Sequence, residues 1–208
     1  DIDPEDGDRI TGIASHRGDL IVFKGPYKLS IHRLTGATIG TIARKVLARG
    51  VGCAAHNSIL PAKNDLAFVD TLGIHSLNAT EVYGDFKEAF LSAPISTYWN
   101  SKIHQGRLND AYGMNFSLGH SLQWFLTESG QTTNTILVGV DYAFDPPWLY
   151  NWPITGASCA VLVNGSGKRA PFIGRYDGFV VEADKAGRDD WSNAFSGIIK
   201  TPAMTFAP

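Results

Sequence analysis

Short runs of apolar residues recur along the chain, and most of them are continuous rather than alternating. They occupy residues 20–23, 66–69, 122–126, 135–140, 159–163 and 179–182. Runs of this length that are rich in aliphatic and aromatic residues predict β-strands. A strand that is apolar on both sides needs cover on both faces, and long amphipathic helical patterns are scarce. We therefore expect the cover to come from other sheets, as in a sandwich, a barrel or a propeller.

Two segments are candidates for helices. The first, TIGTIARKVLAR at 38–49, has four aliphatic residues near helical spacing, but the same pattern equally fits an extended strand. The second, APISTYWNSK at 93–102, has Pro94 at a place where proline can open a helical turn. Two short helices cannot cover six strands, so a fold built from sheets remains the expectation.

Four imperfect repeats accompany the predicted strands. Residues 18–36 and 64–79 each hold Asp-Leu, a Phe, a turn and then Ile-His-x-Leu, and two looser copies cover 121–141 and 170–184. Their centres are Phe23, Phe68, Phe125 and Phe172, which lie 45, 57 and 47 residues apart. A propeller blade takes about 40–50 residues. The spacing predicts an all-β fold with few short helices: a whole or partial β-propeller of four-stranded antiparallel blades.

The tripeptide RGD at 17–19 has the spelling of an adhesion motif that integrins read, but its place in the repeat favours a turn. Glycine accepts a positive φ, and aspartate caps turns through its side chain. The second repeat has KND at 63–65 in the same place, so it keeps the aspartate and loses the motif. We expect Gly18 to lie in a turn between two antiparallel strands.

The bulk composition fits one globular unit. The 208 residues are 44% hydrophobic and 18% charged, with a formal net charge of −2. This gives no basic excess for holding nucleic acid, and the apolar runs are far too short for membrane insertion. We expect one propeller-like domain over 1–208. The first residue is Asp rather than Met, and the final TPAMTFAP resembles a strand, so we also expect the sequence to be part of a longer protein.

The acidic segment DIDPEDGD at 1–8 resembles a calcium loop, but it lacks the distal glutamate that completes one. A solvated acidic turn before the first strand is the preferred interpretation. His32 and His75 hold equivalent places in two repeats, where packing between blades explains them better than a metal site. Cys53 and Cys159 fit two small buried side chains. We predict neither a metal nor a cofactor.

No catalytic set stands out in the sequence. Asp85, Glu88, Asp110 and Asp141 are present, but their spacing does not mark a glycosidase pair. The repeated Asp-box of sialidases, the Gly-x-Ser-x-Gly elbow, the phosphate loop and the His-Glu-x-x-His motif are all missing from the sequence. We therefore predict that the chain is not an enzyme.

Aromatic residues gather between prolines in DPPWLYNWP at 145–153. The prolines exclude a regular central strand, and large rings on a Pro-rich loop suit a protein interface. Trp148, Tyr150 and Trp152 are therefore predicted interface residues. The alternative is that they fill the gap between two blades.

Several stretches resemble a known family. Residues 6–36 read DGDRITGIASHRGDLIVFKGPYKLSIHRLTG, and 50–95 hold GVGC, GIHSL and LSAPI. Together they resemble the β-propeller proteins that form the nozzle or hub of tailed-bacteriophage tails, a group that includes tail tubular protein B-like and packaged-DNA stabilisation proteins. Residues 101–208 match this family loosely, through DYAFDPPWLYNWP and IIKTPAMTF. Members of the family are typically much longer than this chain.

The resemblance implies a structural protein of the virion tail. It implies a ring of six identical copies in contact with other tail proteins, such as adaptor, portal and fibre proteins, with DNA as transient cargo. A near-neutral charge agrees with a channel along which DNA slides. The alternative is an extracellular carbohydrate-binding or glycoside-cleaving β-propeller, which would carry a signal peptide upstream.

Overall fold

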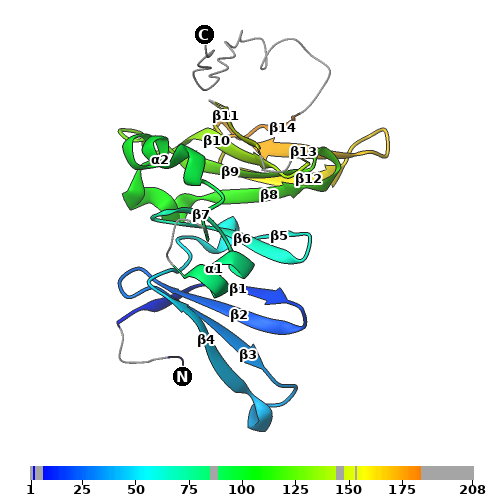
Figure 1. The fold of residues 1–208 in the computed structure, drawn as a ribbon. Coiled ribbons are helices and arrows are strands. Elements are labelled where there is room, and N and C mark those ends of the chain that lie inside the picture. The colour runs from blue at the N-terminus through cyan, green and yellow to red at the C-terminus, as the bar shows by residue number, and fades with distance from the viewer. Residues whose placement is uncertain (1, 3–6, 85–88, 144–147, 153, 184–208) are drawn as a thin grey trace, which may run out of the picture.

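The computed structural model describes residues 2, 7–84, 89–143, 148–152 and 154–183, which form four antiparallel sheets in chain order (Figure 1). Sheet I contains β1 (Arg9–His16), β2 (Asp19–Gly25), β3 (Ser30–Thr35) and β4 (Ala43–Arg49). Sheet II contains β5 (Leu60–Ala62), β6 (Asp65–Asp70) and β7 (Gly73–Ser76). Sheet III contains β8 (Tyr112–Phe116), β9 (Ser121–Thr127), β10 (Asn134–Asp141) and β11 (Trp148–Trp152). Sheet IV contains β12 (Ser158–Val163), β13 (Arg169–Gly174) and β14 (Val180–Glu182).

Each sheet is a simple meander, because strands that neighbour in sequence also pair in space. The helices of the described residues are short. They are α1 (Leu77–Tyr83), α2 (Ser96–Lys102), η1 (Ile39–Thr41), η2 (His56–Ser58), η4 (Ala93–Ile95), η5 (Gln105–Asp110) and η6 (Ser117–Gly119). The prediction of a mostly β structure with few short helices is confirmed.

The four predicted repeat centres fall in four different sheets. Phe23 lies in β2, Phe68 in β6, Phe125 in β9 and Phe172 in β13, and each of these strands has a partner on both sides. Sheets I and III have the expected four strands, whereas sheets II and IV have three in the described part of the chain. The described sheets stack in an open series and do not close into a ring (Figure 1).

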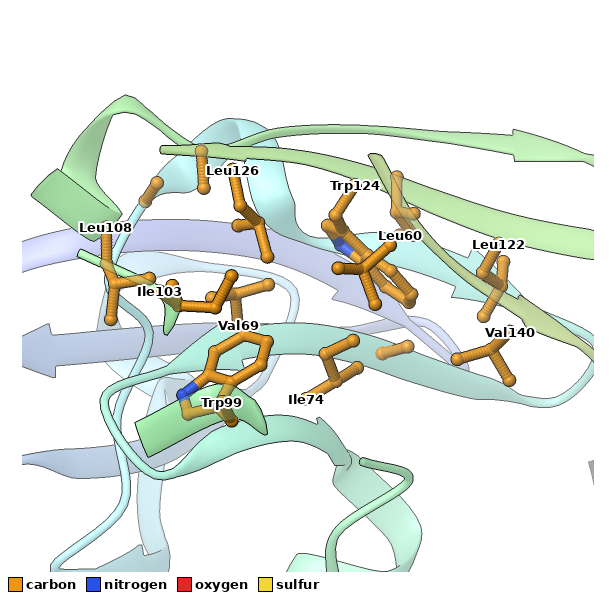
Figure 2. Close-up of a cluster of buried hydrophobic side chains, with 14 of the residues drawn as sticks. Leu60, Val69, Ile74, Trp99, Ile103, Leu108, Leu122, Trp124, Leu126 and Val140 are labelled. Atoms are coloured by element: carbon orange, nitrogen blue, oxygen red, sulfur yellow. The ribbon is translucent and has the colours of Figure 1, made fainter. Parts of the chain in front are cut away.

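Three clusters of buried side chains join successive sheets. The first cluster joins sheets I and II through residues such as Ile21, Phe23 and Phe68. The second, drawn in Figure 2, joins sheets II and III and includes Val69 and Trp124, with Trp99 of α2 beside them. The third joins sheets III and IV. Its fully or nearly buried members are Met114, Phe125, Leu137, Ile154, Cys159, Ile173 and Ala183.

Neighbouring residues of one inner strand serve different clusters. In β6, Phe68 packs in the first cluster and Val69 in the second, and in β9 Trp124 packs in the second and Phe125 in the third. Side chains alternate between the faces of a strand, so a continuous apolar run supplies both faces. For these two inner strands, the prediction that other sheets cover both faces is confirmed.

The repeats are offset by one residue from the alignment that the sequence suggested. The hairpin registers pair His16 with Asp19 in sheet I and Ala62 with Asp65 in sheet II, so Asp19 and Asp65 are equivalent. Phe68 is then the counterpart of Val22 rather than of Phe23. A shift of one residue moves a side chain to the other face. Phe23 and Phe68 consequently face each other across the first cluster, with ring centroids 4.9 Å apart.

The two helix candidates had different outcomes. The 38–49 segment is extended after the short η1, because β4 pairs with β3 along the edge of sheet I. The 93–102 segment is helical, with Pro94 in the first turn of η4 and α2 following directly. Helix α1 was not predicted. It begins where Ser76 Oγ accepts the backbone N–H of Ala79, at 3.1 Å, directly after β7.

Candidate functional site

The RGD tripeptide lies in the β1–β2 hairpin, as predicted. Arg17 and Gly18 have φ values of 52° and 85° and form the two-residue turn between antiparallel strands. Arg17 donates a hydrogen bond of 2.9 Å to the carbonyl of Asn64 in the next hairpin, and the Asp19 carboxylate lies 3.7 Å from Arg33 Nε. Both charged residues of the motif thus have partners within the chain.

A cleft with a volume of about 380 Å³ opens beside the equivalent turn of sheet II. It lies between sheets II and III, and its floor is apolar, including Leu91, Leu122 and Val140. Its rim is polar. The rim residues are Lys63, Asn64, Asp65, Asn78 and Tyr142. Concave sites with an apolar body and a few polar groups are the usual form of ligand pockets, so this cleft is a candidate binding site.

Two strained residues contact the tyrosine of the cleft. The Lys63 ammonium lies 5.2 Å from the centroid of the Tyr142 ring, and His120 meets the same ring edge-on at 5.9 Å. Lys63 and His120 have φ values of 53° and 51°, a left-handed conformation that costs about 1–2 kcal/mol outside glycine. Burial raises the pKa of Tyr142, and the nearby Asp141 charge acts in the same direction. The Tyr142 hydroxyl is therefore protonated at neutral pH.

The carboxylate on the rim of the cleft is already engaged. Asp65 Oδ1 accepts backbone N–H groups of Leu66, at 2.7 Å, and Asn78, at 2.9 Å. Asp65 Oδ2 accepts the hydroxyl of Ser76. These bonds tie the start of β6 to the end of β7 and the start of α1. Asp65 therefore has a structural role, which makes it a poor candidate for a catalytic base.

A second acidic group is buried beside an imidazole. His75 Nε2 lies 4.0 Å from Asp70 Oδ2, and both side chains are buried. The His75 ring stacks on Phe68 at 5.4 Å and contacts Phe90 at 4.2 Å. Burial lowers the pKa of His75 to about 3, so the ring is neutral. Burial also raises the pKa of Asp70, although N–H donors from the backbone partly oppose this shift.

The two equivalent histidines lie on equivalent faces. His75 pairs with Phe68 and His32 pairs with Val22, and Phe68 and Val22 are counterparts. His75 packs toward sheet I, whereas His32 lies on the face of sheet I that turns away from sheet II. Its Nε2 lies 2.9 Å from Ser30 Oγ. The prediction of packing between sheets is thus confirmed for His75. His32 is also fully buried, but no described sheet lies on its side of sheet I, so for His32 it stays a prediction.

Both cysteines are free and buried, as predicted. Burial raises the pKa of each thiol to about 12, so neither forms a reactive thiolate near neutral pH. Cys53 Sγ lies 3.0 Å from the carbonyl of Ala55 and 3.4 Å from Ser58 Oγ. These thiols act as small core side chains.

The acidic segment is described only in part, since Asp1, Asp3, Glu5 and Asp6 lie outside the described residues. Asp8 accepts backbone N–H groups from 27–29, the turn between β2 and β3, at 2.7, 2.9 and 2.9 Å. Its carboxylate therefore fixes a turn. Across the described ranges no group of three or more His, Cys, Asp or Glu residues could hold a metal ion.

The aromatic segment forms a strand rather than the predicted loop. Trp148, Tyr150 and Trp152 belong to β11, the edge strand of sheet III, and their backbones pair with β10. The flanking prolines lie outside the described residues, and an edge position agrees with their exclusion from a central strand. Leu149 packs against the second cluster. An interface role for the three aromatic residues stays a prediction.

The other carboxylates considered for catalysis do not come together in the described structure. Asp110 pairs with Arg107 at 3.0 Å, and Asp141 accepts the N–H of Ala143 at 2.9 Å. Asp85 and Glu88 lie outside the described residues.

The described helices include none that is long and apolar enough to cross a membrane. We also compared the chain with known proteins. No protein-family model matches it, and no curated protein matches it.

Proposed function

We propose that this chain is a structural part of a bacteriophage virion, an arc of β-propeller blades in the tail nozzle or hub. The observation that supports this role is the order of the buried clusters. Sheet II packs against sheets I and III, and sheet III packs against sheets II and IV, always through aliphatic and aromatic side chains. Face-to-face stacking of small meander sheets in chain order is the packing of propeller blades.

The polar groups of the structure support a packing role. Asp8, Asp65 and Asp70 all use their carboxylates to fix backbone N–H groups at turns. Lys63 and Arg17 make contacts with the neighbouring sheet or hairpin. In the proposed role six copies form a ring with adaptor, portal and fibre proteins as neighbours, and DNA passes only as cargo.

Antibodies raised against the chain provide a direct test. On phage particles from its source, the label should gather at the tail, and images of the isolated protein should show a closed ring with a central channel. Particles that carry no label, together with a protein that never forms a ring, would contradict the proposal.

A carbohydrate-binding role is the second candidate, and the cleft beside Lys63 favours it. The amides of Asn64 and Asn78 and the ring of Tyr142 line this cleft, and such groups recognise sugar hydroxyls and the apolar face of a sugar ring. A glycan array tests this role with Tyr142→Ala and Asn78→Ala. Both should abolish any binding, whereas the exposed Tyr83 of α1 supplies the control Tyr83→Ala. Binding that survives both cleft variants would exclude the cleft as the sugar site.

A further inference from the structure

Part of the exposed apolar surface of the described residues lies on the two outermost sheets, I and IV, and part lies on turns and helices between them, as at Leu72, Val82 and Leu118. Large hydrophobic side chains are exposed on β1, β2, β12 and β14 and at the turn before β14. They are Ile10, Ile13, Leu20, Leu162, Val163, Tyr176, Phe179 and Val180. We call the outer side of sheet I the leading face and the outer side of sheet IV the trailing face.

We propose that the trailing face of one copy packs on the leading face of the next copy. This inference rests on the proposed function, which includes a ring of identical copies. It names the two surfaces that form the contact between those copies.

The leading face has the composition of a buried blade face. Ile13 pairs with Val22, and Leu20 pairs with Leu34, so these four side chains share the side of sheet I that is opposite to Phe23. Val22 is buried, in a part of the face where Lys24 donates a hydrogen bond of 2.7 Å to the carbonyl of Ile2. Ile13 and Leu20 remain 48% and 41% exposed.

The counterpart of Leu20 shows what normally covers such a face. Leu66 follows the equivalent turn and aspartate in sheet II, and it is only 2% exposed because it packs in the first cluster against sheet I. Leu20 thus stands where a preceding sheet would bury it. Among the described residues, no sheet lies against the leading face at Leu20, although Val22, Lys24 and His32 on the same face are buried.

Among the described residues, the trailing face also has no sheet packed against it. In sheet III, Phe125 points toward the following sheet and is fully buried. In sheet IV, Ile173 packs on sheet III, so the adjacent Phe172 lies on the other side. Phe172 is half-buried, and Val180 is 67% exposed. No sheet follows on this side among the described residues.

The leading and trailing faces correspond to the two sides that meet at each interface between successive sheets. Every buried interface in the stack joins the trailing side of one sheet to the leading side of the next. In the described part of the chain, no sheet covers the leading side of sheet I or the trailing side of sheet IV. A contact between unlike faces is heterologous, and it forms a ring when its repeated rotation returns to the first copy.

Two single substitutions test the contact, each placing a carboxylate on one face. Leu20→Glu disables the leading face and Val180→Glu disables the trailing face. Val82→Glu is the matched control, because Val82 is 72% exposed on α1, away from both faces. Circular dichroism and thermal unfolding establish that all variants fold. Sedimentation of the whole chain should show an oligomer for the wild type and Val82→Glu, and a monomer for each face variant alone.

Mixing the two face variants gives the decisive result. The Leu20→Glu copy keeps a working trailing face and the Val180→Glu copy keeps a working leading face, so the mixture should form one-to-one dimers and nothing larger. A wild type that stays monomeric, an oligomer that tolerates either variant, or dimers of Val180→Glu alone would overturn the proposal. Antibody label at the phage tail is independent of these measurements, so failure of the head-to-tail contact and failure of the virion role are told apart.

Discussion

Leu20 and Leu66 occupy the same position in two successive hairpins, and they end in opposite environments. Each follows a two-residue turn and an aspartate at the start of a strand. Leu66 is buried between sheets I and II, whereas Leu20 is exposed on the leading face. The local sequence therefore sets the strand and the direction of the side chain. Burial is set by whether another sheet lies against that face.

Two phenylalanines on the trailing sides of their sheets should differ most in the free energy of unfolding that is lost on substitution by alanine. Phe23 is fully buried and contacts Phe68, so Phe23→Ala should lower the free energy of unfolding by about 3–5 kcal/mol. Phe172 is half-buried, so Phe172→Ala removes less apolar area from the core and should cost about 1–2 kcal/mol. Denaturant unfolding of the monomer measures both values. Equal losses would show that the trailing face is covered as fully as the core.

The two leucines give the next comparison. Leu66→Ala should cost about 2–5 kcal/mol because it leaves a cavity in the first cluster. Leu20→Ala in the monomer should change the free energy of unfolding by no more than about 0.5 kcal/mol, as for other surface changes. The same denaturant titration applies. A large loss for Leu20→Ala would mean that the leading face is packed within one copy.

Substitution of the two aspartates that precede these leucines should give a smaller difference in stability. Asp65 accepts three hydrogen bonds from β6, β7 and α1, so Asp65→Ala should cost about 1–3 kcal/mol by leaving its donors unpaired. Asp19 makes a part-exposed pair with Arg33 at 3.7 Å, so Asp19→Ala should cost less than about 1 kcal/mol. Thermal unfolding of both variants checks this order, and the reverse order would contradict the assigned roles.

The buried imidazole of sheet II should make stability depend on pH. The pKa of His75 is lowered from 6.5 to about 3, so between these values the unfolded chain binds a proton that the folded chain does not. Stability therefore falls as pH falls through this window, by at most about 1.4 kcal/mol per pH unit. The raised pKa of Asp70 acts oppositely, because its contribution to stability is lost as pH rises above 3.8.

A pair of variants separates these two groups. Asp70→Asn removes the opposing titration and should steepen the loss of stability from pH 6.5 toward 3, whereas His75→Leu in the same background should flatten it. Urea unfolding at several pH values provides the measurement. An unchanged slope after His75→Leu would show that another group controls the pH dependence.

Much of the fold could be predicted from the sequence, because short apolar runs and glycine turns are local signals. Gly18, with its positive φ, and the Asp-Leu pairs that follow the hairpin turns marked strands correctly. The face of each strand was harder to predict. Phe23 and Phe68 looked equivalent, but turn register, which depends on backbone geometry, placed them on opposite faces and in contact.

The candidate site was less predictable, because it depends on long-range contacts. His120 and Tyr142 are brought together by the pairing of β9 with β10 in sheet III. Lys63 comes from sheet II and reaches the tyrosine ring only through the packing of sheets II and III. The 38–49 segment became a strand because β3 offered a partner, despite its helical spacing. Neither the contacts of the cleft residues nor the pairing of the 38–49 segment can be predicted from local spacing. The cap that Ser76 forms before α1 is a local signal that was not used in predicting the helices.

The smallest effects should come from the two turn residues that make the hairpins alike. Arg17 and Lys63 share a left-handed φ and are both exposed. Arg17→Ala removes a single exposed hydrogen bond to Asn64 and should change the free energy of unfolding by no more than about 0.5 kcal/mol. Arg17→Gly relieves the left-handed conformation and should be neutral or stabilising by up to about 1 kcal/mol. Thermal unfolding measures the stability of Arg17→Ala and Arg17→Gly. A loss of stability for Arg17→Ala as large as that for Phe23→Ala would refute the assignment of this tripeptide to a turn.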